Sequence, residues 1–170
     1  AKMGYEACLQ ALEHPATAMG NVGAGTGATV GKLCGMERAS KTGIGCYAMA
    51  LGELQVAAVV VVNALGDIFD PANGTKIAGL MNKDRTAFGD SCEELWKLGC
   101  PQNLFTGNTT IGAVITNGQF NKAQMNKIAS MTRNAYARCI NPVGTMADGD
   151  SIYAASIGDV KADINVTGTL

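Results

Sequence analysis

The chain has 170 residues, which fits one domain or one large fragment at about 100–200 residues per domain. Its 13 basic and 14 acidic residues give a formal net charge of −1, so we expect no nucleic-acid partner and no binding to an anionic membrane. Hydrophobic residues make up 47%, which argues against disorder, while charged residues are only 16% against an average of about 25%, which indicates a surface partly covered by other chains.

The first part of the chain predicts a helix, a glycine-rich loop and a hairpin. Apolar residues at helical spacing from Tyr5 to Leu12 predict a short amphipathic helix that ends before Pro15. Glycines at 20, 23, 25, 27 and 31 predict a loop, or a strand in close backbone contact. Residues 44–51 and 54–65 predict the two strands of a hairpin, the second buried on both faces because its apolar residues hardly alternate with polar ones.

The second part predicts two helices and two further strands. Residues 67–90 are rich in turn signals, and Ser91 begins a capping pattern for a short helix that runs to Leu98. A strand is expected over 109–116, a strong helix over 125–139 that ends before Pro142, and a last strand over 151–157. Because strands and helices mix without a βαβ rhythm, the sequence predicts an α+β fold.

The glycine-rich loop matches two nucleotide-binding motifs only formally. Residues 23–28 fit G-x-G-x-x-A, but a helix precedes them and a poor helix start follows, so a dinucleotide site is not expected. A P-loop would need Gly in place of Thr26 and a hydroxyl in place of Leu33. What remains is Lys32 presented on a constrained backbone, or simply a packing turn with a solvated lysine.

Metal, disulfide and membrane interpretations find little support. The six cysteines form no C-x-x-C pair and His14 is the only histidine, so we expect reduced thiols and no metal site, with disulfides as the alternative. The longest apolar run, 56–62, is far shorter than the roughly 20 residues that span a bilayer. No signal peptide opens the chain, and it begins at Ala1, so we expect an upstream piece to be missing and the cytoplasm as the default compartment.

Two adjacent threonines, Thr109 and Thr110, stand at the start of the strand expected over 109–116. A threonine hydroxyl is a weak nucleophile that needs an adjacent base, and the only imidazole lies in another segment, so a Ser-His-Asp triad is not available. One remaining solution is a threonine at a chain N-terminus, whose α-amino group has a pKa of about 7.7–8.0 and can act as the base. An internal threonine becomes such a terminus only if the bond before it is cut.

Four segments together resemble the DmpA-type self-processing hydrolases. They are residues 20–32 (GNVGAGTGATVGK), 61–67 (VVNALGD), 108–112 (NTTIG) and 148–150 (DGD). That family includes L-aminopeptidase D-amidase/esterases, β-peptidyl aminopeptidases and 6-aminohexanoate-oligomer endohydrolases, and the Asn-Thr-Thr junction is most similar to the nylon-oligomer hydrolase branch. The resemblance implies an αββα sandwich similar to the DmpA/ornithine-acetyltransferase-like fold, present here as a partial domain.

The resemblance also implies the roles of the reacting residues. Thr109 would attack the carbonyl of Asn108, and the cleavage would leave Thr109 as a new N-terminus that attacks the substrate amide. The side-chain amide of Asn63 would donate to the developing oxyanion, although an amide at the end of a buried strand can also simply satisfy backbone groups. Thr110 stays an alternative nucleophile.

Lys32, Asp148 and Asp150 complete the implied site. Lys32 would hydrogen-bond or electrostatically bias the nucleophile, and the two aspartates would orient the nucleophile and Lys32 and keep the lysine charged. By itself, Asp148-Gly149-Asp150 is also an ordinary turn, or a fragment of a calcium loop that lacks the later ligands.

The resulting expectation is an amide hydrolase that acts on short peptides or 6-aminohexanoate-type oligomers and needs no cofactor. Residues 1–108 would be the C-terminal part of an α-subunit region and 109–170 a β-subunit region, within one domain incomplete at both ends. We expect a homo-oligomer of processed heterodimers. The alternatives are an acyltransferase of the ornithine-acetyltransferase type and an uncleaved, inactive homologue or binding scaffold.

Overall fold

The computed structural model describes residues 2–14, 18–99 and 107–170. The helices are α1 (Lys2–Glu13), α2 (Ser91–Leu98), α3 (Lys122–Cys139) and α4 (Ile164–Thr169), with 3-10 turns at Gly23–Gly27 and Met36–Arg38. The strands are β1 (Thr29–Val30), β2 (Ser40–Lys41), β3 (Ile44–Leu51), β4 (Leu54–Val61), β5 (Asp67–Phe69), β6 (Lys76–Ala78), β7 (Ile111–Gly118), β8 (Ile140–Asn141) and β9 (Ser151–Val160). The mixture confirms the α+β prediction.

The largest sheet has the strand order β3-β4-β7-β9. β3 and β4 form the predicted antiparallel hairpin, and β4 pairs antiparallel with β7. β7 and β9 are parallel, with Ile111 opposite Ser151, and α3 lies between them in the chain. Parallel neighbours need such a crossover. The chain therefore does contain one βαβ unit, β7-α3-β9, although no βαβ rhythm was expected.

This topology brings three chain segments to one edge of the sheet. The parallel pairing sets the residues before β7 beside the residues before β9, and an isolated bridge joins Asn108 to Asp148 there. Since β4 runs antiparallel to β7, the residues that follow β4 reach the same edge. Asn63, Thr109 and Asp150 are thereby gathered from positions far apart in the sequence.

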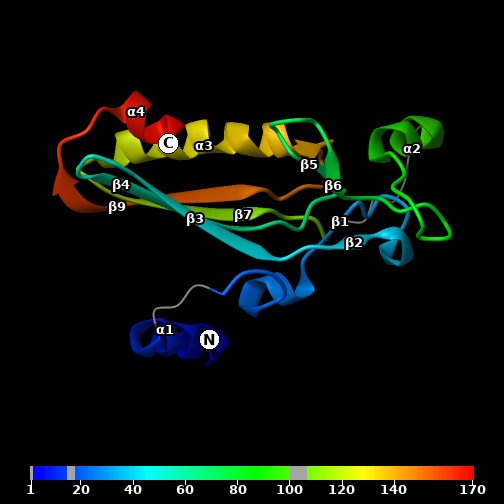
Figure 1. The fold of residues 1–170 in the computed structure, drawn as a ribbon, viewed down its shortest axis with the longest axis horizontal. Coiled ribbons are helices and arrows are strands. Elements are labelled where there is room, and N and C mark those ends of the chain that lie inside the picture. The colour runs from blue at the N-terminus through cyan, green and yellow to red at the C-terminus, as the bar shows by residue number, and fades with distance from the viewer. Residues whose placement is uncertain (1, 15–17, 100–106) are drawn as a thin grey trace.

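Among the described residues, α3 packs on one face of the large sheet. Figure 1 shows α3 and α4 on one side of the sheet and α1 on the other. The covered face contains a core of Leu54, Val56, Val114, Met125 and Ile128. On the opposite face, Ile111, Ile115, Tyr153 and Ile157 are exposed among the described residues.

Two expectations about burial are wrong because the sheet face opposite α3 is exposed among the described residues. Residues 57–61 of β4 are half-buried, whereas the sequence predicted burial on both faces. The α1 helix forms as predicted, but it buries no residue, and Tyr5 and Leu12 on its apolar stripe are 68% and 81% exposed. The apolar pattern therefore marks surface that no element among the described residues covers.

A smaller sheet has the strand order β6-β5-β8. β5 and β6 lie in the segment predicted as turns, and β8 follows α3. Asp67 at the start of β5 is fully buried and accepts hydrogen bonds from Lys76 Nζ (2.8 Å), Leu80 N (2.8 Å), Ser91 N (2.9 Å) and Ser91 Oγ (2.7 Å). Ser91 was expected to cap α2, and this is wrong. Asp90 is the N-cap, because its carboxylate accepts the N–H groups of residues 92 and 93 while the Ser91 hydroxyl turns inward to Asp67.

The described ranges hold no helix with the length and apolar character needed to cross a bilayer. Within the same ranges, no three His, Cys, Asp or Glu side chains gather so as to hold a metal ion. The cysteines at 8, 34, 46, 92 and 139 are free thiols, and Cys100 lies outside the described residues.

Candidate active site

The glycine-rich segment directs Lys32 into the molecule. Gly31 adopts φ +67°, and its N–H donates to Gly66 O at 3.0 Å, while Lys32 N donates to Leu65 O at 3.2 Å. A Cβ on Gly31 would lie 2.0 Å from Leu80 N, so only glycine fits this close approach. The Lys32 side chain that follows is 1% exposed, which rules out the solvated lysine of the packing-turn alternative.

The Lys32 ammonium donates to a set of carbonyl oxygens. Nζ lies 2.6 Å from Asn63 Oδ1, 3.1 Å from Gly107 O and 3.4 Å from Asn63 O. Burial lowers the pKa of Lys32 to about 8, and the negative charge of Asp148 partly opposes that shift. Lys32 is therefore still mainly protonated at neutral pH, in agreement with its geometry as a donor.

Asn63 follows β4 and has a fixed amide orientation. Its Oδ1 accepts from Lys32 Nζ and also from Thr29 N at 3.3 Å, so Nδ2 points the other way. Nδ2 donates to Gly107 O at 2.9 Å. Two donors, one neutral and one cationic, thus converge on a single carbonyl oxygen.

Thr109 lies at the Asn108 carbonyl. The Thr109 hydroxyl oxygen is 2.6 Å from Asn108 O and donates to it, and the Thr109 N–H donates to Asn63 O at 2.7 Å. Asn108 O also accepts the N–H of Gly149 at 2.9 Å. The Asn108–Thr109 bond therefore has a hydroxyl beside its carbonyl and a backbone donor on its oxygen.

The two aspartates are bound mainly to neighbouring backbone. Asp148 accepts from Leu65 N (3.3 Å), Thr145 N (3.1 Å) and Thr145 Oγ1 (2.7 Å), and Asp150 accepts from Thr110 N at 2.8 Å. Burial raises the pKa of Asp150, with the Thr110 N–H opposing that shift and the charge of Asp148 adding to it. The Asp150 contact fixes the residue directly after Thr109, and the Asp148 contacts tie its loop to Leu65 and Thr145.

Thr110 and Tyr136 lie on the covered side of the sheet. Thr110 is fully buried, whereas Thr109 is only half-buried and its hydroxyl meets the Asn108 carbonyl. The Tyr136 hydroxyl is buried without a hydrogen-bond partner among the described residues, and burial raises its pKa to about 12. A Cβ on Gly112 would lie 2.6 Å from that hydroxyl, so the glycine makes room for it.

The structure thus brings together all six residues that the sequence singled out, namely Lys32, Asn63, Asn108, Thr109, Asp148 and Asp150. It adds two residues that the sequence did not indicate, Gly107 and Gly149, which contribute backbone atoms. Gly149 belongs to the Asp148-Gly149-Asp150 segment that the sequence singled out. Its backbone N–H could not be recognised as a donor from the sequence, because nearly every residue carries one.

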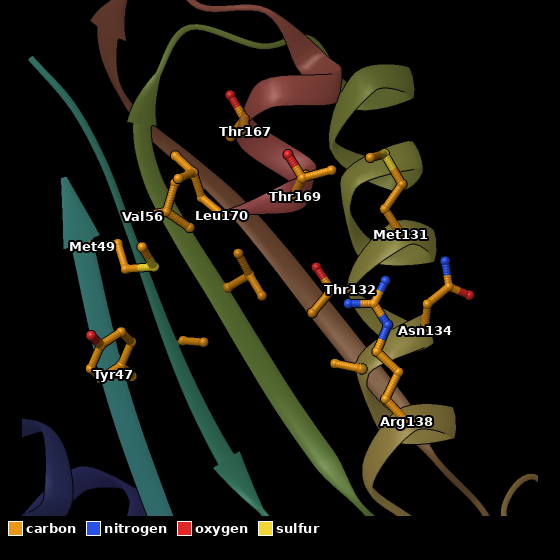
Figure 2. Close-up of a pocket in the computed structure, with 14 residues that line it drawn as sticks. Tyr47, Met49, Val56, Met131, Thr132, Asn134, Arg138, Thr167, Thr169 and Leu170 are labelled. Carbon is orange, nitrogen blue, oxygen red and sulfur yellow. The ribbon is translucent and has the colours of Figure 1, made fainter. Parts of the chain in front are cut away.

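A separate groove of about 370 Å³ lies on the helix-bearing face of the sheet. Figure 2 shows Tyr47 and Met49 entering it from β3, Arg138 from α3 and Leu170 from the end of the chain. None of the six singled-out residues lines this groove. The candidate site is therefore defined by the contacts of Thr109 rather than by this groove.

Comparison with known sequences identifies the family of the chain. The chain matches the sequence profile of Peptidase family S58 over residues 1–167. An uncharacterized aminopeptidase of Mycobacterium leprae is 33% identical over 172 aligned residues, covering 95% of this chain and 45% of that protein. A 6-aminohexanoate-oligomer endohydrolase of Agromyces sp. is 32% identical over 144 residues, covering 83% of this chain and 40% of that protein. The chain spans less than half the length of these relatives.

Two solved structures share the fold. A protein of Pyrococcus horikoshii superposes with a TM-score of 0.57 at 21% identity, covering 92% of this chain and 38% of that one. The L-aminopeptidase D-Ala-esterase/amidase of Ochrobactrum anthropi, described as a variant of the Ntn hydrolase fold, superposes with a TM-score of 0.53 at 18% identity, covering 82% and 32%. The described elements therefore correspond to part of that fold.

Proposed function

The chain belongs to peptidase family S58, and from this membership we propose that it is an amide-bond hydrolase whose nucleophile is Thr109, freed by cleavage of its own Asn108–Thr109 bond. The observation that carries the proposal is the 2.6 Å contact between the Thr109 hydroxyl and the Asn108 carbonyl oxygen. This contact sets the nucleophile beside the bond that must break.

In the proposed self-cleavage, Thr109 Oγ attacks the carbonyl carbon of Asn108. The C–N bond then breaks, the hydroxyl proton ends on the Thr109 nitrogen, and an ester joins Asn108 to Thr109 Oγ. Water hydrolyses that ester. The products are an Asn108 carboxylate and a Thr109 with both a free hydroxyl and a free α-amine.

The new α-amine then acts as the base for the hydroxyl. Its pKa of about 7.7–8.0 leaves a useful neutral fraction near neutral pH. The hydroxyl attacks a substrate amide, the amine passes the proton to the leaving group, and water hydrolyses the acyl-enzyme. Asn63 Nδ2 would stabilise the substrate oxyanion, a contribution of about 3–4 kcal/mol for one such donor. Its existing hydrogen bond to Gly107 O supports this role.

Lys32 and the two aspartates are proposed to position these groups. Lys32 fixes the Asn63 amide through its 2.6 Å contact with Oδ1 and places a positive charge near the developing oxyanion. Asp148 keeps Lys32 charged, in the direction that its effect on the lysine pKa indicates. Asp150 holds the Thr110 N–H and so fixes the first residues of the cleaved chain.

We further propose short peptides with free N-termini or 6-aminohexanoate-type oligomers as substrates, because one relative is an aminopeptidase and another an endohydrolase of such oligomers. Self-association as an oligomer of processed heterodimers is also proposed. The exposed apolar side chains Ile115, Tyr153 and Ile157 support it. Light scattering that gives the mass of a single processed heterodimer would contradict it.

The proposal is tested by intact mass and N-terminal sequencing of the purified chain beside Thr109→Ala. Cleavage yields fragments of 108 and 62 residues, the second beginning with Thr109-Thr110-Ile111. Thr109→Ala should stay whole, because the attacking hydroxyl is gone.

Thr110→Val is the matched control. It removes the neighbouring hydroxyl at nearly constant volume and keeps the backbone N–H that Asp150 accepts. We expect this variant to cleave at the same bond. An unmodified chain that stays at 170 residues would refute the proposal, and a cleaved Thr109→Ala would refute the assignment of the nucleophile.

A further inference from the structure

We propose that the backbone N–H of Gly149 is the oxyanion donor of the self-cleavage step, separate from the Asn63 amide assigned to substrate hydrolysis. This inference rests on the proposed function. It concerns the charge that develops on Asn108 O when Thr109 Oγ attacks the carbonyl carbon. A donor on that oxygen lowers the barrier to the tetrahedral intermediate.

The first argument is the geometry of the Asn108 carbonyl. Its oxygen accepts the Gly149 N–H at 2.9 Å, within the 2.7–3.1 Å that an oxyanion donor requires. The Thr109 hydroxyl also donates to this oxygen at 2.6 Å in the uncut chain. When that hydroxyl loses its proton and attacks, the Gly149 N–H remains on the oxygen.

The second argument is where the Asn63 amide points. Asn63 Nδ2 donates to Gly107 O at 2.9 Å, and Lys32 Nζ lies 3.1 Å from the same oxygen. That carbonyl is one residue before the bond to be cut. Successive carbonyls of an extended chain point in different directions, so the donors engaged with Gly107 are aimed away from the Asn108 oxygen.

The third argument is that the residue before Gly149 is held in place. Asp148 pairs with Asn108 in a parallel bridge, and its carboxylate is fixed by the hydrogen bonds described above. The donor therefore needs little reorganisation when the charge develops, which is the condition under which such a group is effective.

The fourth argument is the residue type. A Cβ at position 149 would lie 2.9 Å from Thr109 Oγ1, closer than real Cβ contacts allow. Glycine lets the backbone approach the reacting hydroxyl and carbonyl together. A side chain here would push the nucleophile from the carbonyl carbon that it must reach.

The test removes this one N–H without adding a side chain. Glycolic acid replaces Gly149 by nonsense suppression in cell-free synthesis of the whole chain, which turns the 148–149 peptide bond into an ester. The matched control puts the hydroxy analogue of serine at Ser151, which removes the N–H that Thr110 O accepts. Self-cleavage is followed by intact mass after translation is stopped, and thermal unfolding of each chain is recorded.

We expect the Gly149 ester to slow cleavage by about 10²–10³-fold, as the loss of one oxyanion donor does, and the Ser151 ester by less than about threefold. Both esters lose one backbone hydrogen bond, so their unfolding temperatures should be similar. Equal cleavage rates for the two esters would overturn the inference while the proposed function stands. An unmodified chain that never cleaves would overturn the proposed function, and this inference with it.

Discussion

The buried ammonium of Lys32 should make the stability of this chain depend on pH. The pKa of Lys32 is about 8 in the folded chain against 10.5 as the ordinary value, because burial disfavours the charge more than Asp148 favours it. Between these two values, the unfolded chain binds more protons at this position than the folded chain. The free energy of unfolding therefore rises with pH over this window, and the penalty of the buried charge is fully present below about pH 8.

The size of the effect follows from the shift. One pKa unit corresponds to about 1.4 kcal/mol, so the charge of Lys32 lowers the free energy of unfolding at about pH 7 by up to about 3 kcal/mol. At about pH 9.5, the unfolded chain is still largely protonated while the folded chain is not, which leaves a penalty of about 1.4 kcal/mol. The gain between the two conditions is about 2 kcal/mol.

The perturbation is Lys32→Met, which keeps an unbranched chain and removes the charge. The acceptor atoms of Lys32 retain a hydrogen-bond donor in this variant. Asn63 Oδ1 still accepts from the Thr29 N–H, and Gly107 O still accepts from Asn63 Nδ2. The variant should lose the part of the pH dependence that comes from this lysine. Every other titrating group is common to both proteins, so the difference between their pH dependences isolates Lys32.

The assay is urea unfolding followed by circular dichroism at about pH 7 and about pH 9.5. Both proteins carry Thr109→Ala, so that self-cleavage does not divide the chain. The parent should gain about 2 kcal/mol more than the Met variant on going to the higher pH. Parallel changes in the two proteins would refute the reasoning, because Lys32 would then have its ordinary pKa in the folded chain.

Three further substitutions test the packing around the site. Asp67→Ala leaves the half-buried Lys76 ammonium without its carboxylate, so the free energy of unfolding in urea should fall by about 3–5 kcal/mol; a loss below about 1 kcal/mol would contradict the buried ion pair. Tyr136→Phe removes a buried hydroxyl without a hydrogen-bond partner among the described residues, so the same measurement should change by less than about 1 kcal/mol. Gly31→Ala introduces a Cβ at φ +67° and 2.0 Å from Leu80 N, so it should lower the unfolding temperature and slow self-cleavage through displacement of Lys32; normal cleavage would show that the loop tolerates the change.

Local patterns were enough to predict the longer elements of this fold. The apolar stripe of α3 and the turn between β3 and β4 are encoded by neighbouring residues, and both elements are confirmed. The short strands β5, β6 and β8 and the helix α4 were missed, since two to six residues are too few to show a period. The parallel pairing of β7 with β9 was also missed, because it joins segments that are distant in the sequence.

Burial could not be predicted for the same kind of reason. An apolar residue type in β4 or α1 shows that a position can be buried, but not which element will cover it. Among the described residues, the sheet face that bears Ile115 and Tyr153 has no packed cover. The chain spans less than half the length of the relatives that it matches.

The site was predictable only in part. Residue chemistry alone left Thr109 and Thr110 as alternatives, and the resemblance to a self-processing family favoured Thr109. The geometry separates them, since the Thr110 side chain is fully buried while the Thr109 hydroxyl meets the Asn108 carbonyl. Backbone groups such as the Gly149 N–H could not be found this way, because every residue except proline carries one and only the fold decides where it points.

The contacts of Gly107 connect the two proposed reactions. In the uncut chain, the Gly107 carbonyl oxygen accepts hydrogen bonds from Asn63 Nδ2 and, at 3.1 Å, from Lys32 Nζ. The same two groups are proposed to face the carbonyl oxygen of the substrate. Cutting the Asn108–Thr109 bond creates the nucleophile's base but does not by itself vacate these donors. On the proposed mechanism, residues 107 and 108 must also move away before a substrate carbonyl can reach these donors. If the proposed mechanism holds, the uncut chain is blocked twice: the α-amine of Thr109 is missing, and the Gly107 carbonyl takes the place of the substrate carbonyl.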